Sequence, residues 1–224
     1  MNQTVKNWDT SYYACHFYWH QALYHLEKGD FEATGEIFEN EILTRSMDKK
    51  SPLHSRDISS LVYRVEFEDP IKSNNMIGGH RDFLGDISEP FIHDHSCTFI
   101  DAQFVMALCV ARRYSKAEEL IEISRTAVTT SGEPVIIDLL EAVLDYSREK
   151  YAECVEKLFP IRHDLKTIGG SGPQRDVFHQ MLIVSAMRSP KFGHRQIAKL
   201  LLNERAVVRD NSQLTQRLAN QLNN

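Results

Sequence analysis

The chain has 224 residues, a mass of 25.8 kDa and a net charge of −5, with 42% hydrophobic and 25% charged residues. A chain of this length buries roughly 70% of the surface that its unfolded form exposes, so its core needs no disulfides. The composition is close to that of an average globular protein and excludes the disordered, collagen-like and fibrous classes.

The sequence also lacks the usual marks of secreted and membrane proteins. Its first residues do not combine a basic start with an apolar core, and no apolar run approaches the roughly 20 residues that span a membrane. The four cysteines are scattered and form no C-x-x-C pair, which favours free thiols in a reducing compartment. We therefore expect a cytoplasmic protein that does not bind membranes.

The first predicted helical hairpin covers residues 12–46. Apolar side chains recur at helical spacing up to Lys28. Gly29 ends this helix, because glycine suits the left-handed position after a helix, and Asp30 can cap the next helix by accepting from its free amides. Further hairpins are predicted at residues 97–130, 134–167 and 173–209. In the last of these, the Ser171-Gly-Pro-Gln174 run predicts a capping box.

Three of these hairpins can be aligned on the aromatic residue that follows each turn. The aromatic residues are Phe31, Tyr114 and Tyr151, and a small residue follows each of them three places later: Thr34, Ala117 and Cys154. Nine places before each aromatic there is a short side chain: Ala22, Val105 and Ala142. Seven places after each aromatic there is a bulky apolar residue: Phe38, Ile121 and Leu158. This pattern is typical of tetratricopeptide repeats, whose two helices approach closely where a side chain is short. We predict an all-α fold of tetratricopeptide-like helical hairpins stacked in a superhelical array, with an unrelated helical bundle as the alternative.

Two segments differ from the repeats. Residues 68–92 are rich in Pro, Gly and Asn and predict an irregular insertion, either an exposed loop with a short helix or a lid over a groove. Residues 212–222 predict a C-terminal capping helix with an apolar stripe of Leu214, Leu218 and Leu222. The stripe would cover the preceding repeat, and a homodimer would follow if it were left exposed. We expect residues 1–224 to form a single helical-repeat domain.

Charge is distributed unevenly along the chain. Residues 157–209 hold ten Lys and Arg against three Asp and Glu, a charge of +7 that leaves −12 for the remainder. A surface for an acidic partner or nucleic acid is one interpretation. The basic residues are spread out and lack interleaved stacking aromatics, so solvated helix faces attracted to the acidic part are favoured and nucleic acid is not expected.

A family resemblance is visible in three stretches. The run "GGSGPQRDVFHQMLI", the later "IAKLLLNERAVVRDNSQLTQRL" and the earlier "YWHQALYHLEKGDFEA" resemble the tetratricopeptide repeat protein 38 family over most of the chain. The resemblance implies an all-α, tetratricopeptide-like superhelical array. Family members are usually longer, and the chain is similar to their C-terminal half. The resemblance supplies no catalytic residues and no cofactor.

His16 and His20 lie four residues apart on one predicted helix, a spacing by which two imidazoles can bind one zinc ion. The zincin pattern needs a glutamate beside the first histidine, but Phe17 occupies that position. The favoured interpretation is that both histidines make polar contacts between helices, with Trp19 packed beside them. They are only weak metal candidates, and no metal is expected.

Other polar residues suggest a ligand site at a helix start. Arg175 and Asp176 follow Gln174 in the first turn of a predicted helix, where a guanidinium and free amides could bind a carboxylate or phosphate. A structural role for the pair, in helix capping and helix-dipole contacts, is favoured. Asp101, in the first turn of another predicted helix, is a further candidate.

No phosphate-binding loop, dinucleotide fingerprint, nucleophile elbow or zinc-finger spacing is present in the sequence. The favoured function is a scaffold that binds a protein or peptide partner in a concave groove, without a defined catalytic activity. The alternative is an enzyme or a small-ligand or metal-binding protein whose polar pocket gathers His16, His20, Asp101, Arg175 and Asp176.

Overall fold

The computed structural model describes residues 13–49, 51–94, 97–131 and 135–223. Within these ranges the chain is helical apart from short turns and contains no strand, so the predicted all-α class is confirmed. The expected starts of the first and third hairpins, at residues 12 and 134, lie outside the described ranges. None of the described helices is both long and apolar enough to cross a membrane.

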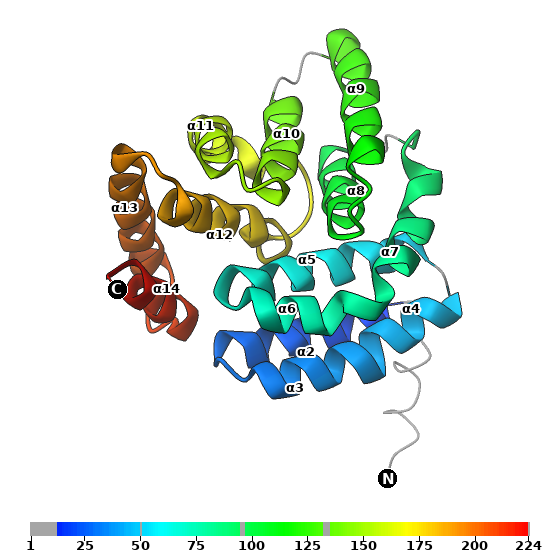
Figure 1. Ribbon diagram of the computed structural model, residues 1–224, viewed down its shortest axis with the longest axis horizontal. Coiled ribbons are helices and arrows are strands. Elements are labelled where there is room, and N and C mark those ends of the chain that lie inside the picture. The colour runs from blue at the N-terminus through cyan, green and yellow to red at the C-terminus, as the bar shows by residue number, and fades with distance from the viewer. Residues whose placement is uncertain (1–12, 50, 95–96, 132–134, 224) are drawn as a thin grey trace.

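Helices pair at the positions where the sequence predicts hairpins, as Figure 1 shows. The pairs are α2 (Ala14–Glu27) with α3 (Phe31–Ile37), α8 (Thr98–Val110) with α9 (Tyr114–Ser131), α10 (Val135–Ser147) with α11 (Tyr151–Ile161), and α12 (Gly172–Arg188) with α13 (Phe192–Val208). The C-terminal helix α14 (Gln213–Asn223) follows the last pair. α3 continues through a π-helical turn (Phe38–Leu43) into α4 (Thr44–Lys49), so this helix extends past the predicted end at residue 46.

The residues aligned in the three repeated hairpins occupy equivalent places. Each turn aromatic, Phe31, Tyr114 or Tyr151, is the first residue of the second helix of its hairpin. All nine small and bulky residues of the alignment are buried in the shared core. The pattern therefore identifies where paired helices pack, because a short side chain on each helix lets the two backbones approach.

The turns of these hairpins share one backbone conformation. Gly29, Arg112 and Glu149 each have a positive φ, between 60° and 76°. In each turn the N–H of the positive-φ residue donates to the carbonyl three residues before it. The N–H of the following residue donates to the carbonyl five residues before that following residue. These bonds satisfy carbonyls at the end of the first helix. Asp30 then caps α3 as predicted, since its side chain accepts from the amide of Ala33 at 3.1 Å.

The prediction of an irregular insertion at residues 68–92 is wrong. This segment forms α6 (Pro70–Ile77) and α7 (Arg81–Ser88), each followed by a single 3₁₀ turn, Gly78–His80 and Glu89–Phe91. Asp69 accepts from the amide of Lys72 at 3.0 Å, and proline fits the first helical position, where no amide bond is needed. The cap therefore outweighs the Pro, Gly and Asn content that predicts a loop.

The helix α5 (Pro52–Glu68) was not part of any predicted hairpin, yet it lies at the centre of the molecule. It packs against α2, α6, α8 and α12, as the cyan helix in the middle of Figure 1 shows. Ser55 and Ser59 on α5 are fully buried, and short side chains allow neighbouring helices to approach on several sides. One continuous core joins α5 to the hairpins on both sides of it.

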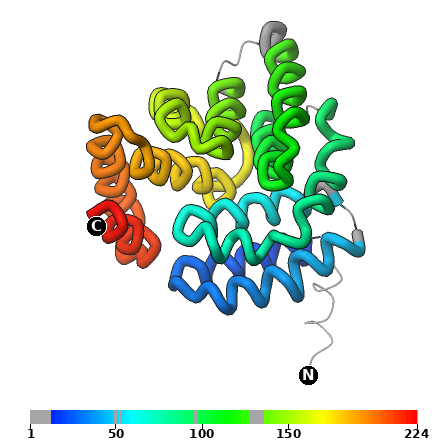
Figure 2. Tube along the Cα trace, viewed as in Figure 1, coloured from blue at the N-terminus to red at the C-terminus, as the bar shows by residue number. Residues whose placement is uncertain are grey.

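The C-terminal helix covers the last hairpin and also contacts the first helix of the described chain. Leu214, Leu218 and Leu222 are buried, so the stripe of the capping helix is covered within the chain. α14 packs against α13 and α2, and Figure 2 shows the red C-terminal helix beside the blue turn that follows α2. A Cβ atom placed on Gly29 would lie 3.2 Å from the Arg217 guanidinium, so glycine suits both the turn and this contact.

The shared turn conformation predicts how a substitution in the turn changes the stability of the protein. Glu149 has a φ of 60°, a region that costs a residue with a Cβ about 1 kcal/mol and costs glycine little. Glu149→Gly should therefore raise the free energy of unfolding by up to about 1 kcal/mol and the melting temperature by about 2–4 °C. Calorimetry or urea unfolding measures both quantities.

The neighbouring residue provides the control. Lys150 has a φ of −82°, so Lys150→Gly adds only flexibility to the unfolded chain and should lower stability. Equal effects of the two substitutions would contradict this account of the turn.

Candidate functional site

His16, Trp19 and His20 form a ring cluster on α2. His16 stacks on Trp19 with centroids 5.1 Å apart, and His20 contacts both rings edge-on at 4.8 Å. The Nδ1 atom of His16 lies 3.0 Å from a carboxylate oxygen of Asp57 on α5. Burial, followed by the nearby His16, lowers the pKa of His20, so His20 is neutral at neutral pH. The cluster joins α2 to α5.

His16 and His20 are not joined by further metal-ligating side chains within the described residues. Among them, no group of three or more His, Cys, Asp or Glu side chains is arranged to hold a metal ion. The contacts of His16 with Trp19 and Asp57 are those of packing and positioning residues.

Of the remaining predicted residues, Asp101 lies apart, whereas Gln174, Arg175 and Asp176 lie together at the start of α12. Asp101 is buried in the first turn of α8 and lines neither of the two cavities described below. Gln174 completes the capping box that the sequence predicts, since the Ser171 amide donates to its side chain at 2.8 Å and its own amide donates to the Ser171 hydroxyl. Arg175 donates to the carbonyls of Gly169 and Gly170 and holds the turn before α12. Gln174 and Arg175 therefore define the start of α12.

Asp176 is the centre of a buried ion network. Arg205 on α13 donates to both carboxylate oxygens of Asp176, at 2.6 and 2.9 Å, in a bidentate pair. Arg209 adds an ion pair at 3.0 Å, and Gln180 donates to Asp176 at 2.7 Å. The network attaches α13 to α12. It also holds Arg209, whose side chain is 41% exposed, at the surface.

The ionisation state of Asp176 follows from these contacts. Burial alone would raise its pKa, but the hydrogen bonds and charge of Arg205, with the charges of Arg209 and Arg64, outweigh burial. The pKa of Asp176 is held far below its usual range. Asp176 is therefore a carboxylate at neutral and mildly acidic pH.

A cavity of about 490 Å³ lies beside this network, between α12, α13 and the segment that follows α11. We call it the basic cleft. Its basic lining residues are Arg162, His163, Lys166, Arg175, His179, Arg205 and Arg209. Its acidic residues are Asp176 and Glu204, and its apolar residues include Ile183, Leu201 and Val208. Several basic residues of segment 157–209 thus gather around one cleft, which differs from the scattered solvated faces favoured by the sequence.

A second cavity, of about 510 Å³, lies on the other side of Asp176 and Arg209. We call it the inner pocket. It is formed by α2, α5, the start of α12 and the turn between α13 and α14, and it shares Pro173, Asp176 and Arg209 with the basic cleft. His20 and Asp176 are the two predicted residues that the fold brings to this pocket.

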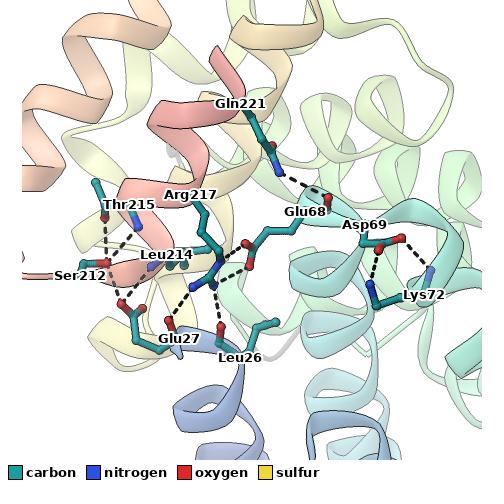
Figure 3. Close-up of polar contacts among 10 residues, drawn as sticks. All are labelled: Leu26, Glu27, Glu68, Asp69, Lys72, Ser212, Leu214, Thr215, Arg217 and Gln221. Atoms are coloured by element: carbon teal, nitrogen blue, oxygen red, sulfur yellow. Dashed lines mark hydrogen bonds and ion pairs between the residues drawn. The ribbon is translucent and has the colours of Figure 1, made fainter. Parts of the chain in front are cut away.

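The turn that borders the inner pocket is fixed by a cluster of contacts shown in Figure 3, which we call the clasp. Arg217 on α14 pairs with the carboxylate of Glu68 at 2.6 and 3.1 Å. It also donates to the carbonyls of Leu26 and Glu27, at the end of α2. The Glu27 side chain accepts from the hydroxyl of Ser212 at 2.8 Å. The clasp thus joins the first and last helices of the described chain.

No sequence pattern indicates that Arg64, Arg205 and Arg209 lie around these two cavities. Arg205 and Arg209 lie four residues apart at the end of α13, but Arg64 belongs to α5, and no spacing rule connects α5 with α13. The charge of segment 157–209 was the only sign, and it does not say which residues converge.

No family model matches the chain, and no solved structure matches it significantly. The resemblance to the tetratricopeptide repeat protein 38 family therefore stays a prediction from the sequence motifs.

The Asp176 network predicts a pH-dependent loss of stability. In Asp176→Asn, Arg205 remains buried without its carboxylate, so stability at neutral pH should fall by about 3 kcal/mol. The folded pKa is depressed, so the contribution of the carboxylate is complete above its unfolded pKa of about 3.9 and declines as the pH falls toward the folded value. Urea unfolding across this range should show the difference from wild type shrinking in acid.

The exposed Asp210 is a matched control for this experiment. Asp210→Asn removes the same charge at the surface and should change stability by less than about 0.5 kcal/mol. A difference between Asp176→Asn and wild type that does not depend on pH would contradict the role of the ionised carboxylate.

The contacts of the clasp predict that Arg217 stabilises α14. Arg217→Gln leaves the Glu68 carboxylate, whose side chain is 3% exposed, without its partner, and should cost about 3 kcal/mol. Hydrogen exchange of the α14 amides should become faster than in wild type. Gln221→Ala on the same helix removes only an exposed 3.4 Å bond and should have little effect on either measurement. Unchanged exchange in Arg217→Gln would show that the clasp does not hold α14.

Proposed function

We propose that the protein is a scaffold of tetratricopeptide-like hairpins in a superhelical array, and that it binds an acidic segment of a partner protein in the basic cleft. The observation that carries this proposal is the combination of an apolar floor and a cationic rim in one cavity of about 490 Å³. Electrostatic complementarity of this kind selects an acidic partner and speeds its association.

The groups on the rim support an acidic partner. Burial lowers the pKa of His179, so His179 is neutral at neutral pH and the permanent charges come from the arginines and Lys166. Arg205 is already paired with Asp176, and Arg175 is engaged with backbone carbonyls. Arg209 uses one nitrogen for Asp176, and Arg162 uses one for a backbone carbonyl, so both keep N–H donors for acidic side chains. Lys166 is exposed on the rim.

The floor supports a peptide that also carries apolar residues. Ile183 and Leu201 are buried beneath the cleft, whereas Val208 is 82% exposed at its edge. An apolar side chain placed between two acidic ones could cover this edge while the carboxylates contact the rim. Short peptides that alternate acidic and apolar residues have the required chemistry.

The alternative function, an enzyme or small-ligand protein using His16, His20, Asp101, Arg175 and Asp176 together, has less support. No cavity gathers all five: His20 and Asp176 line the inner pocket, and Arg175 and Asp176 line the basic cleft. Asp176 is held by Arg205 and Gln180. An ionised, fully bonded carboxylate is a poor general base. A peptide-binding role requires no such group.

The same proposal includes a cytoplasmic location, membership of the tetratricopeptide repeat protein 38 family and a protein or peptide as the partner. It includes no nucleic acid, no membrane and no cofactor. A homodimer is a second candidate state, since Phe192, Val207 and Val208 on α13 are more than 80% exposed.

Fluorescence anisotropy tests the proposal. A short fluorescein-labelled peptide in which Glu and Leu alternate should bind the wild-type protein, and its affinity should fall as salt is raised. The same peptide with Gln in place of Glu should bind more weakly. Lys166→Glu, which reverses an exposed charge on the rim, should weaken the Glu-Leu peptide about tenfold.

Lys199→Glu provides the matched control, because Lys199 is exposed on α13 and does not line the cleft. It makes the same change in net charge, so equal weakening by both variants would show attraction to the whole protein and would refute a site in the cleft. Equal binding of the Gln-Leu and Glu-Leu peptides would exclude an acidic partner.

A further inference from the structure

Arg64, on the central helix α5, is a buried guanidinium beside the inner pocket. Its residue is 2% exposed and it is one of the groups that line the pocket. It donates to the carbonyl and hydroxyl of Ser60 and, at 2.6 Å, to the carbonyl of Pro173. These acceptors are neutral, and Arg64 forms no direct ion pair with a carboxylate in the described ranges. A buried charge without a paired countercharge is costly, so this arrangement favours an anion nearby.

The surroundings of Arg64 add positive charge. Burial lowers the pKa of Arg64 to about 10; the charges of Asp176 and, less strongly, Asp57 oppose this effect, and the charges of Arg205 and Arg209 reinforce it. Arg205 and Arg209 contact Asp176 directly, and Arg64 lies close enough to be affected by all three charges. Arg209 uses one nitrogen for its ion pair with Asp176, and a guanidinium has five N–H donors. Donors for an additional anion thus exist on the wall of the inner pocket.

The rest of the inner pocket is both apolar and acidic. Leu23, Leu26 and Leu214 provide apolar lining. Glu27 and Asp210, on the side of the clasp and the last turn, also line the pocket. A second anionic group would be repelled by these two residues. The volume, about 510 Å³, is within the range of cavities that bind small molecules.

From these observations we infer that the inner pocket is a binding site for a small organic acid with one carboxylate and a short apolar body. The carboxylate lies against Arg209, with Arg64 behind it, and the apolar body lies against the leucines from α2 and α14. This site is distinct from the peptide site in the basic cleft, with which it shares a wall.

Isothermal titration calorimetry with hexanoate tests the inference. Hexanoate should bind the wild-type protein with one site per chain, whereas hexanol, which lacks the charge, and adipate, which has a second carboxylate, should bind at least about tenfold more weakly. Inorganic phosphate should also bind more weakly than hexanoate. No binding of hexanoate at millimolar concentrations, equal binding of hexanol, or a preference for phosphate would overturn the inference.

Variants locate the site. Arg209→Gln should weaken hexanoate about tenfold, and Lys199→Gln, which removes one charge from the same helix outside the pocket, should not. Asp210→Asn should improve the binding of adipate relative to hexanoate, because it removes one repelling charge. Unchanged hexanoate binding in Arg209→Gln would exclude this pocket.

Arg64→Met is a second test of the anion site, with circular dichroism to confirm that the variant folds. Where folding fails, Leu23→Trp replaces it, since a larger side chain on α2 fills the pocket and leaves every arginine in place. Hexanoate binding should be lost in whichever of these two variants folds. Retained binding would overturn the inference.

Discussion

The contact between Arg217 and Glu68 is the interaction on which the arrangement of the two ends depends. Arg217 also holds the last carbonyls of α2, so a single side chain joins α2, α5 and α14. Stacked hairpins normally contact only their neighbours. Here the first and last helices of the described chain meet, and the turn between α13 and α14 is therefore placed against α2. Without this contact the inner pocket would lack one of its walls.

The second determinant is the charge around Asp176. A carboxylate with a bidentate arginine satisfies both partners, but Arg64 and Arg209 place two further positive charges near Asp176, and Asp57 is the other carboxylate that acts on Arg64. Such an arrangement lowers the stability of the fold, since desolvated charges often contribute less to the free energy of folding than apolar residues of similar size. The position of these charges, around the wall shared by two cavities, is most easily understood if they serve binding. This is why both proposals involve anionic groups.

Local rules predicted the hairpins well, because they depend on residues close in sequence. Gly29, Asp30 and the Ser171–Gln174 box fix helix ends through bonds that span few residues. The same rules missed Arg112 and Glu149, whose left-handed turns carry no glycine to mark them. They also missed α5, whose buried serines read as polar, and α6 and α7, where the Asp69 cap outweighs the loop-like composition. The convergence of Arg64, Arg205 and Asp176 depends on three packed helices, which no local pattern encodes.

The contacts of α5 and α14 bear on where a partner can bind. In an open superhelix, the concave face formed by the first helices of the hairpins is the usual binding surface. In this protein the first helices α2, α8 and α12 pack against α5, and the clasp brings α14 to α2. Two of the cavities lie instead where α12 and α13 meet the rest of the chain. Because Asp176 and Arg209 belong to both, any ligand that attracts Arg209 into one cavity competes with the other for the same guanidinium.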